Sequence, residues 1–416
     1  MLDRIKPRRA WPVRVAVRAA LAVALGGAIL GAAVLGAAPG LAQAATPGRS
    51  AATSATPTAT ARQTIGGPKL SSRGVVVGYA AKKAPRLPGI QASSFVVAEA
   101  STGQVLAAKD PHGYYQPAST IKMLTAVTLI PLLHPNSTVV ASKLATSTVP
   151  NVVGLVTGRA YKISDLFTAL LTISANDAAI ALTQATGSFS KGMTLINAEA
   201  RQLQADDTAA VEPNGLDAPG QRSSAYDLAL IARQALAEPA FLKYDQTLSA
   251  RFVVKRHDAV TLDNQNSLLT SYQGAIGGKI GWTSAAGATY VGMATRHGVT
   301  LIVTLLHCPA LTEVKSAETL LNWGFSAAGK VTPVGTLVSP LPPPAPKPPV
   351  KAAAGAPASA ATPRVQAVSR PRAAAAGPSV LAAAGFSCAA VAAAAAGFAY
   401  SRRQRLRAAA PGRYRS

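Results

Sequence analysis

The chain contains the stretch Gln116-Pro117-Ala118-Ser119-Thr120-Ile121-Lys122-Met123-Leu124-Thr125-Ala126. This stretch predicts the start of a helix, because Pro117 suits the first helical turn, where an N–H group would have no partner. Residues three apart lie on one helix face, so the Lys122 amine is expected within hydrogen-bonding reach of the Ser119 hydroxyl. Free N–H groups at a helix start also favour negative charge that develops beside Ser119. The spacing therefore indicates a serine nucleophile with a lysine base.

Two further motifs follow in the chain. Ser174-Ala175-Asn176 lies at a break in a region, residues 162–204, whose apolar pattern is helical. Taken alone, this motif is explained by a helix cap, since Asn and Asp often begin a helix. Lys279-Ile280-Gly281 lies in a predicted strand and follows Gly277-Gly278, which could simply be loop residues. Ser-x-x-Lys alone occurs by chance in many proteins, but three such motifs in order indicate one active site.

The body of the chain predicts an α+β fold. A β-hairpin is expected near the start, helices in the middle, and three strands with a closing helix at the end. The sheet would then be assembled from both ends of the domain, with flanking helices and a mainly helical subdomain. The predicted hairpin strands are 95–100 and 104–108, the later strands are 277–284, 288–294 and 299–307, and the helices are 162–204, one after Tyr226-Asp227, and 311–325.

Segments outside this body have other compositions. The predicted organisation is a signal peptide (1–44), a disordered Ala/Thr/Pro spacer (45–86), a catalytic domain (87–333), a Pro/Ala-rich linker (334–379), a transmembrane helix (380–400) and a basic cytoplasmic tail (401–416). The first segment has a basic start, an apolar run and Ala-Gln-Ala before a cleavage position, although an uncleaved anchor helix is the alternative. The Ala-rich segment 380–400 precedes an Arg-rich run, which predicts a span with its tail inside, and a surface-lying helix is its alternative.

Charge excludes one class of partner. The net charge of +24 and the pI near 10.5 would suit a nucleic-acid-binding protein. Residues 87–333, however, contain 17 Lys and Arg against 16 Asp and Glu, so the body is nearly neutral and the tails carry the excess. Basic residues beside hydrophobic segments fit a lipid bilayer and anionic surfaces better than base readout. We therefore expect no nucleic-acid partner.

No cofactor or metal is expected. The two cysteines, Cys308 and Cys388, are predicted in different compartments, which leaves no structural disulfide and no cysteine-based metal site. The five histidines are scattered without ligand spacing, and ordinary surface or core roles are expected for them: His112, His134, His257, His297 and His307.

The order Ser-x-x-Lys, Ser-x-Asn, Lys-x-Gly resembles that of the penicillin-recognising serine enzymes. Within them, the chain is similar to the D-alanyl-D-alanine carboxypeptidases, the low-molecular-mass penicillin-binding proteins, which have a β-lactamase/transpeptidase-like fold. The resemblance covers about residues 94–325. Connecting segments are similar too, namely Pro117-Ala118-Ser119, Ile173–Ala178, Pro213-Asn214-Gly215-Leu216-Asp217 and Asn264–Leu269.

The resemblance implies roles for the motif residues. Ser119 would attack the carbonyl of the penultimate D-Ala and form an acyl-enzyme, and Lys122 would accept its proton, which requires a lowered pKa. Ser174 would relay a proton to the leaving amine, and Asn176 would orient Lys122 and the substrate amide.

The resemblance also implies a substrate-binding strand, with Lys279, Gly281, Trp282 and Thr283 as its residues. Lys279 would provide positive charge near the substrate carboxylate, and the N–H groups of Ser119 and Trp282 would form the oxyanion hole. The implied partners are peptidoglycan stem peptides and, as covalent inhibitors, β-lactam antibiotics.

One residue departs from the family pattern. Ile280 replaces a threonine whose hydroxyl binds the terminal carboxylate of the substrate, and Thr283 is expected on the opposite strand face. The implied function is a membrane-tethered, extracytoplasmic serine D,D-carboxypeptidase. Because of Ile280, a catalytically weakened penicillin-binding or wall-binding regulatory protein remains an alternative. A β-lactamase is a further alternative, but it needs Glu-x-x-Leu-Asn, and after Glu212 the leucine, Leu216, stands one place too late.

Overall fold

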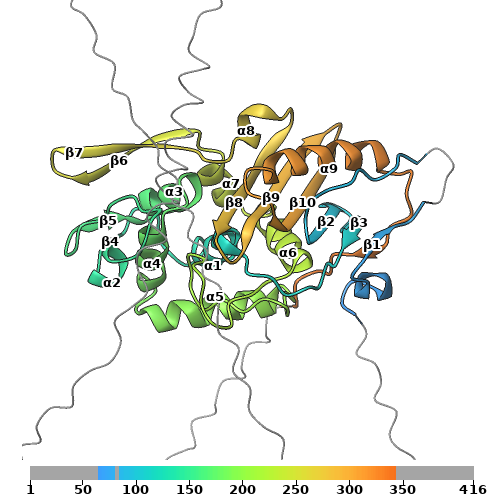
Figure 1. The fold of residues 1–416 in the computed structure, drawn as a ribbon. Helices are drawn as coiled ribbons and strands as arrows, with labels where there is room; N and C mark the ends of the chain where they lie inside the picture. Colours follow the sequence, from blue (N-terminus) through green and yellow to red (C-terminus); the bar gives the residue numbers. More distant parts are fainter. Residues whose placement is uncertain (1–63, 80–83, 343–416) are drawn as a thin grey trace, which may run out of the picture. The chain divides into compact units, whose positions relative to one another are not determined.

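The computed structural model describes residues 64–79 and 84–342 (Figure 1). One antiparallel sheet dominates this part, with strands in the order β1-β3-β2-β10-β9-β8 and β11 paired with β3. The expected hairpin and the three later strands are confirmed with small changes at their ends. The strands are β1 Val75–Val77, β2 Ser94–Glu99, β3 Gln104–Lys109, β8 Ala275–Thr283, β9 Gly287–Arg296, β10 Val299–Cys308 and β11 Gly335–Thr336.

The two ends of the domain meet at the centre of the sheet. Val97 of β2 pairs with Val303 of β10, so the first hairpin is joined directly to the last one. This pairing confirms the prediction of a sheet built from both ends of the domain. It also leaves β8 at an edge of the sheet, because β8 pairs only with β9.

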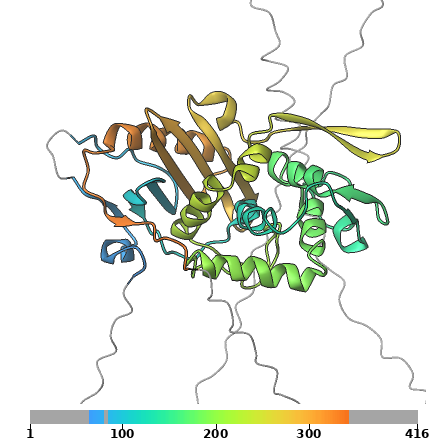
Figure 2. The same ribbon diagram turned by 180° about the vertical axis from the view of Figure 1, so that it is seen from behind.

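Helices cover both faces of the sheet. Side chains alternate along β10: Leu301 and Val303 face the cluster beneath α9 (Glu313–Ala327), whereas Ile302 belongs to the larger core on the other face. α9 lies in front of the sheet in Figure 1, and α6 (Ala225–Leu236) lies in front of it in the reverse view of Figure 2.

A mainly helical subdomain lies beside the sheet, as expected from the apolar pattern of residues 162–204. α1 (Lys122–Leu129) forms its centre, and all eight of its residues are buried. The surrounding helices are α2 Lys143–Thr146, α3 Ile163–Thr172, α4 Asn176–Gln184, α5 Phe189–Gln202 and α7 Pro239–Asp245. The short helices η1 (Pro68–Ser71), η2 (Ala118–Ile121) and α8 (Leu268–Ser271) complete the set in the described residues.

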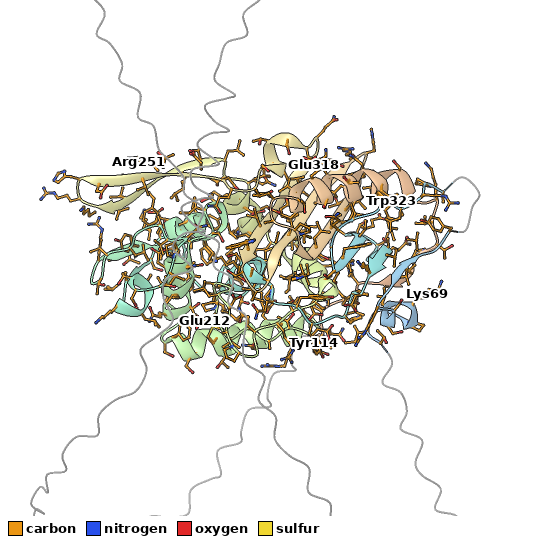
Figure 3. All side chains as sticks on the ribbon, viewed as in Figure 1. Lys69, Tyr114, Glu212, Arg251, Glu318 and Trp323 are labelled. Carbon is orange, nitrogen blue, oxygen red and sulfur yellow. The ribbon has the colours of Figure 1, made fainter. Side chains whose placement is uncertain are left out.

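Two small two-stranded sheets were not predicted. β4 (Thr138–Val140) pairs with β5 (Ala160–Lys162), and β6 (Ser249–Lys255) pairs with β7 (Asp258–Asp263). The β6–β7 hairpin projects beyond the subdomain, where Arg251 is exposed, as is Lys69 at the other end of the molecule (Figures 1 and 3).

The structure corrects both boundaries of the predicted domain. Val75–Val77 fell in the expected spacer but pairs with β3, and the neighbouring Leu70 is fully buried. Gly335–Thr336 fell in the expected linker but also pairs with β3, and Leu337 is 1% exposed. Composition predicted disorder, but these short segments are ordered because β3 supplies their backbone hydrogen-bond partners. The folded domain therefore includes residues 64–79 and 84–342.

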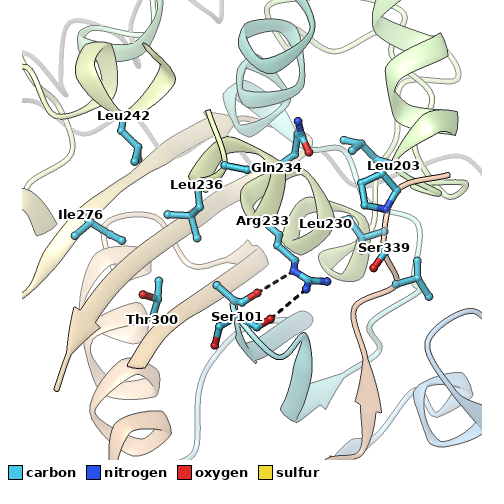
Figure 4. A pocket seen from close by; sticks show the side chains of 14 residues that line it. Ser101, Leu203, Leu230, Arg233, Gln234, Leu236, Leu242, Ile276, Thr300 and Ser339 are labelled. Atoms are coloured by element: carbon cyan, nitrogen blue, oxygen red, sulfur yellow. Dashed lines mark hydrogen bonds between the residues drawn. The ribbon is translucent and has the colours of Figure 1, made fainter. Parts of the chain in front are cut away.

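Arg233 of α6 fixes the end of this domain. Its guanidinium donates hydrogen bonds to the carbonyls of Ala100 (2.8 Å), Ser101 (3.3 Å) and Leu337 (3.0 Å). Arg233, Ala100 and Ser101 line a cavity of about 540 Å³ between α6 and the segment 338–340 (Figure 4). Because all three contacts are to backbone carbonyls, the Arg233 guanidinium has a structural role and holds the last described residues against the domain.

The predicted signal peptide, transmembrane helix and basic tail lie outside the described residues. Across residues 64–79 and 84–342, no helix is both long enough and apolar enough to cross a bilayer.

Candidate active site

Ser119 lies in the 3-10 turn η2, directly before α1. The turn is held from two sides. The Thr289 hydroxyl of β9 donates to the Pro117 carbonyl at 2.8 Å, and the backbone of Gly215 approaches so closely that a Cβ there would lie 1.9 Å from the Ala118 carbonyl oxygen. Ala118 has a φ of +47°, which is uncommon for a residue with a side chain. The surrounding contacts thus fix a strained turn that leaves Ser119 partly accessible.

Lys122 is fully buried one helical turn from the serine. Its Nζ lies 2.9 Å from Ser119 Oγ, 2.7 Å from Asn176 Oδ1 and 2.5 Å from the Asn214 carbonyl oxygen. Burial lowers the pKa of Lys122 well below its usual value, the charge of Lys279 lowers it further, and Asp177 opposes the shift.

These three contacts suit both protonation states of Lys122. An ammonium has three donors, one for each acceptor. A neutral amine keeps two N–H donors, which Asn176 Oδ1 and the Asn214 carbonyl can accept, and its lone pair then faces the Ser119 hydroxyl. Loss of the proton therefore converts Lys122 from a donor into an acceptor toward Ser119, as a general base requires.

The second motif supplies the partner of Lys122. Asn176 begins α4, and its Nδ2 donates to the Val149 carbonyl at 2.9 Å, which directs Oδ1 toward Lys122. Ser174 precedes it with a φ of +62°, and its buried Oγ has no hydrogen-bond partner in the described part of the chain. The hydroxyl of Ser174 therefore has no hydrogen bond within the described structure.

The third motif lies on the edge strand β8, next to Ser119. A Cβ on Gly281 would lie 2.8 Å from Ser119 N and 2.4 Å from Thr289 Oγ1, so only glycine allows this approach. Lys279 is 1% exposed, and its Nζ donates to the Ile280 carbonyl at 2.8 Å. Burial lowers the pKa of Lys279 to about 8, although the charge of Asp245 opposes the shift.

The neighbours of Lys279 on β8 have different surroundings. Ile280 is half-buried and packs against the apolar cluster that contains its strand partner Tyr290. The Thr283 hydroxyl donates to Asp217 Oδ1 at 2.7 Å, and Asp217 follows the segment that brings the Asn214 carbonyl to Lys122. Trp282 is 49% exposed.

The structure therefore brings all three motifs together around Ser119. The matching family model, described as D-alanyl-D-alanine carboxypeptidase, covers residues 81–309. The chain belongs to the D-alanyl-D-alanine carboxypeptidase family. The penicillin-binding protein fold and the α+β class predicted from the sequence are thereby confirmed.

Individual relatives of this carboxypeptidase agree. DacB2 of Mycobacterium tuberculosis, named a D-alanyl-D-alanine carboxypeptidase, is 39% identical over 246 residues, which are 58% of this chain and 84% of the relative. DacD of Escherichia coli, which carries the same name, is 31% identical over 265 residues, 59% of this chain and 67% of the relative.

Solved structures show the same fold. A D-alanyl-D-alanine carboxypeptidase from Mycobacterium tuberculosis matches with a TM-score of 0.58 at 37% identity, over 64% of this chain and all of that one. A variant of the Streptomyces K15 DD-transpeptidase matches with a TM-score of 0.55 at 26% identity, over 57% of this chain and 99% of that one.

Sequence reasoning missed two groups at the site of this carboxypeptidase. The Asn214 carbonyl contacts Lys122, but a backbone oxygen leaves no signal in residue type, even though its segment was recognised as similar to the family. Asp245 is fully buried at the end of α7 and accepts the Gly278 N–H at 2.7 Å. A single aspartate far from the motifs in sequence gave no reason to select it.

One other cluster contains possible metal ligands. Atoms of His112, Asp207 and Asp227 lie within 4.8 Å of one another. Both ring nitrogens of His112 already contact protein oxygens, with Nδ1 at 2.7 Å from Asp207 Oδ2 and Nε2 at 3.1 Å from the Ile65 carbonyl. This arrangement ties the first described residues to the domain.

Proposed function

We propose that this carboxypeptidase removes the terminal D-Ala of peptidoglycan stem peptides through an acyl-enzyme on Ser119. The observation that carries the proposal is the buried Lys122 Nζ, 2.9 Å from Ser119 Oγ. Its lowered pKa favours the neutral amine, which can accept the hydroxyl proton as Ser119 attacks.

The bond changes follow from this placement. Ser119 Oγ bonds to the carbonyl carbon of the penultimate D-Ala while its proton passes to Lys122. The C–N bond to the terminal D-Ala then breaks, and the leaving nitrogen takes a proton relayed by Ser174, whose hydroxyl is otherwise unpartnered. Water next attacks the ester and releases the shortened peptide, which regenerates Ser119.

The oxyanion of the tetrahedral intermediate would be bound by the N–H groups of Ser119 and Trp282. The close packing of Gly281 against Ser119 N supports this role, because it holds the β8 backbone beside the nucleophile. Lys279 would provide positive charge for the substrate carboxylate. β-Lactams would acylate Ser119 by the same attack, with ring opening in place of loss of D-Ala.

The proposed location is outside the cytoplasm, tethered to the membrane. It rests on the sequence of residues 1–44, 380–400 and 401–416. The neutral charge balance of the domain supports it, because the basic residues are concentrated beside the hydrophobic segments.

The test is release of D-Ala from a pentapeptide by the wild-type protein and by Ser119→Ala. We expect release only by the wild type, and undiminished release by the variant would refute the nucleophile. Acylation by penicillin without any release of D-Ala by the wild type would instead support the binding-only function that Ile280 keeps open.

A further inference from the structure

Asp245 is a buried carboxylate that the proposed mechanism does not use. It is the last residue of α7 and has no exposed surface. Its Oδ2 accepts the Gly278 N–H at 2.7 Å, whereas its Oδ1 has no hydrogen-bond partner in the described residues. A buried charge with so few donors is costly unless an opposite charge lies nearby.

Lys279 is the complementary group. Its side chain is 1% exposed, and its three donors have one acceptor in the described structure, the Ile280 carbonyl. Asp245 accepts the N–H of Gly278, so the carboxylate lies beside the β8 backbone one residue before Lys279. The two side chains form no direct ion pair in the described structure, but the charge of each favours the charged form of the other.

The two glycines before Lys279 allow this approach. A Cβ on Gly277 would lie 2.3 Å from Asp245 Oδ2, so any other residue would displace the carboxylate. Gly277 and Gly278 have φ values of +143° and +139°, which residues with side chains rarely adopt. The Gly-Gly pair is therefore shaped to receive Asp245 and is more than a flexible loop.

The charge on Lys279 also affects Lys122, the proposed base. It is the second cause, after burial, of the lowered pKa of Lys122, whereas Asp177 of α4 acts in the opposite direction. The charge of Asp245 favours the charged form of Lys279. Burial raises the pKa of the Asp245 carboxyl group to about 7. Asp245 also acts on the buried Tyr290 of β9, whose hydroxyl donates to Asn266 Oδ1 at 2.6 Å.

We infer that Asp245 is a positioning residue that keeps the buried Lys279 ammonium charged, and thereby maintains both substrate-carboxylate binding and the basicity of the Ser119–Lys122 pair suited to neutral pH. The inference rests on the proposed acylation of Ser119. It adds a residue outside the three motifs to the groups that set the pH range of the reaction.

The sign of the effect follows from the charges. Without the Asp245 carboxylate, the pKa of Lys279 falls below about 8, so Lys279 loses its proton at a lower pH. A neutral Lys279 no longer lowers the pKa of Lys122, so Lys122 becomes a competent base only at a higher pH. The alkaline limb of the bell-shaped pH profile of acylation should therefore move to lower pH, whereas the acid limb, where Lys279 is protonated in both proteins, should stay in place.

The experiment compares the pH dependence of Ser119 acylation by a fluorescent penicillin in the wild type and in Asp245→Asn. Asparagine keeps the shape and an oxygen for the Gly278 N–H, but not the charge. We expect the alkaline limb to move down by about one to three pH units, as for loss of a neighbouring opposite charge. An alkaline limb that coincides with that of the wild type would overturn the inference.

Two further variants separate charge from structure. Asp227→Asn is a matched control, because Asp227 is 1% exposed and has a pKa raised to about 7 but faces His112 and Asp207; its profile should match the wild type. In Lys279→Arg the guanidinium stays charged, so adding Asp245→Asn should no longer move the alkaline limb. A shift of the same size in that background would also refute the inference. Absence of acylation in the wild type would instead refute the proposed function.

Discussion

Ile280 offers the sharpest test of carboxylate recognition. It occupies the position at which the family usually has threonine, on the edge strand β8 and next to Lys279. Part of its side chain packs against the cluster containing Tyr290, and the rest is accessible. We predict that Ile280→Thr raises the efficiency of D-Ala release, because it restores a hydroxyl beside a charged carboxylate.

The magnitude follows from the contact that is gained and the packing that is lost. A hydrogen bond to a charged group contributes about 1.5 to 3 kcal/mol. Since about 1.4 kcal/mol changes a rate tenfold, kcat/KM should rise about ten- to a hundredfold. The shortened side chain should cost about 0.5 to 1.5 kcal/mol of stability, the range for removal of one methylene group from a core. The fold should therefore survive, since threonine is also β-branched.

Ile280→Val is the matched control. Valine has the shape of threonine without the hydroxyl, so it shares the packing loss but not the new hydrogen bond. The assay is D-Ala release from a pentapeptide, with thermal unfolding measured in parallel. Equal kcat/KM values for the threonine and valine variants would refute the reasoning and would mean that the carboxylate is bound elsewhere, for example near Thr283.

Three other outcomes are expected. Labelling with a fluorescent penicillin, followed by peptide mapping, should place the adduct on Ser119 alone; an adduct on another serine, or unchanged labelling of Ser119→Ala, would contradict this. Gly281→Ala should lower the acylation rate by at least about tenfold, because its Cβ would lie 2.8 Å from Ser119 N; an unchanged rate would mean that the strand moves without consequence. A reporter fused after Ser416 should be active only in the cytoplasm, and activity outside would mean that residues 380–400 do not span the membrane.

Much of the fold was predictable because the strands near both ends of the domain are long, apolar and bounded by turns. The motifs around Ser119, Asn176 and Lys279 also carried enough information to predict one site. The sequence could not show which groups, far apart along the chain, become neighbours in the fold. The Asn214 carbonyl and Asp245 are brought to the site by tertiary packing alone.

The domain boundaries were wrong for a related reason. Val75–Val77 and Gly335–Thr336 are too short to be recognised as strands in the sequence that surrounds them. They are strands because their backbones pair with the free edge of β3. The β6–β7 hairpin was missed because it buries few side chains, namely Phe252 and Val254 on β6 and Leu262 on β7, which leaves only a weak apolar pattern in the sequence.

The pairing of β2 with β10 also determines when activity can arise during synthesis. Ser119 leaves the ribosome early. The sheet that positions it, however, lacks its central strand pair until β10, which pairs with Val97 of β2, has been made. Contacts between such distant segments form slowly, because a long intervening loop must first be closed. A chain interrupted before β8 would carry the nucleophile and its base without the strand that binds substrate. The protein should therefore become able to react with penicillin late and in a single step. Nascent or truncated chains should not be acylated by penicillin.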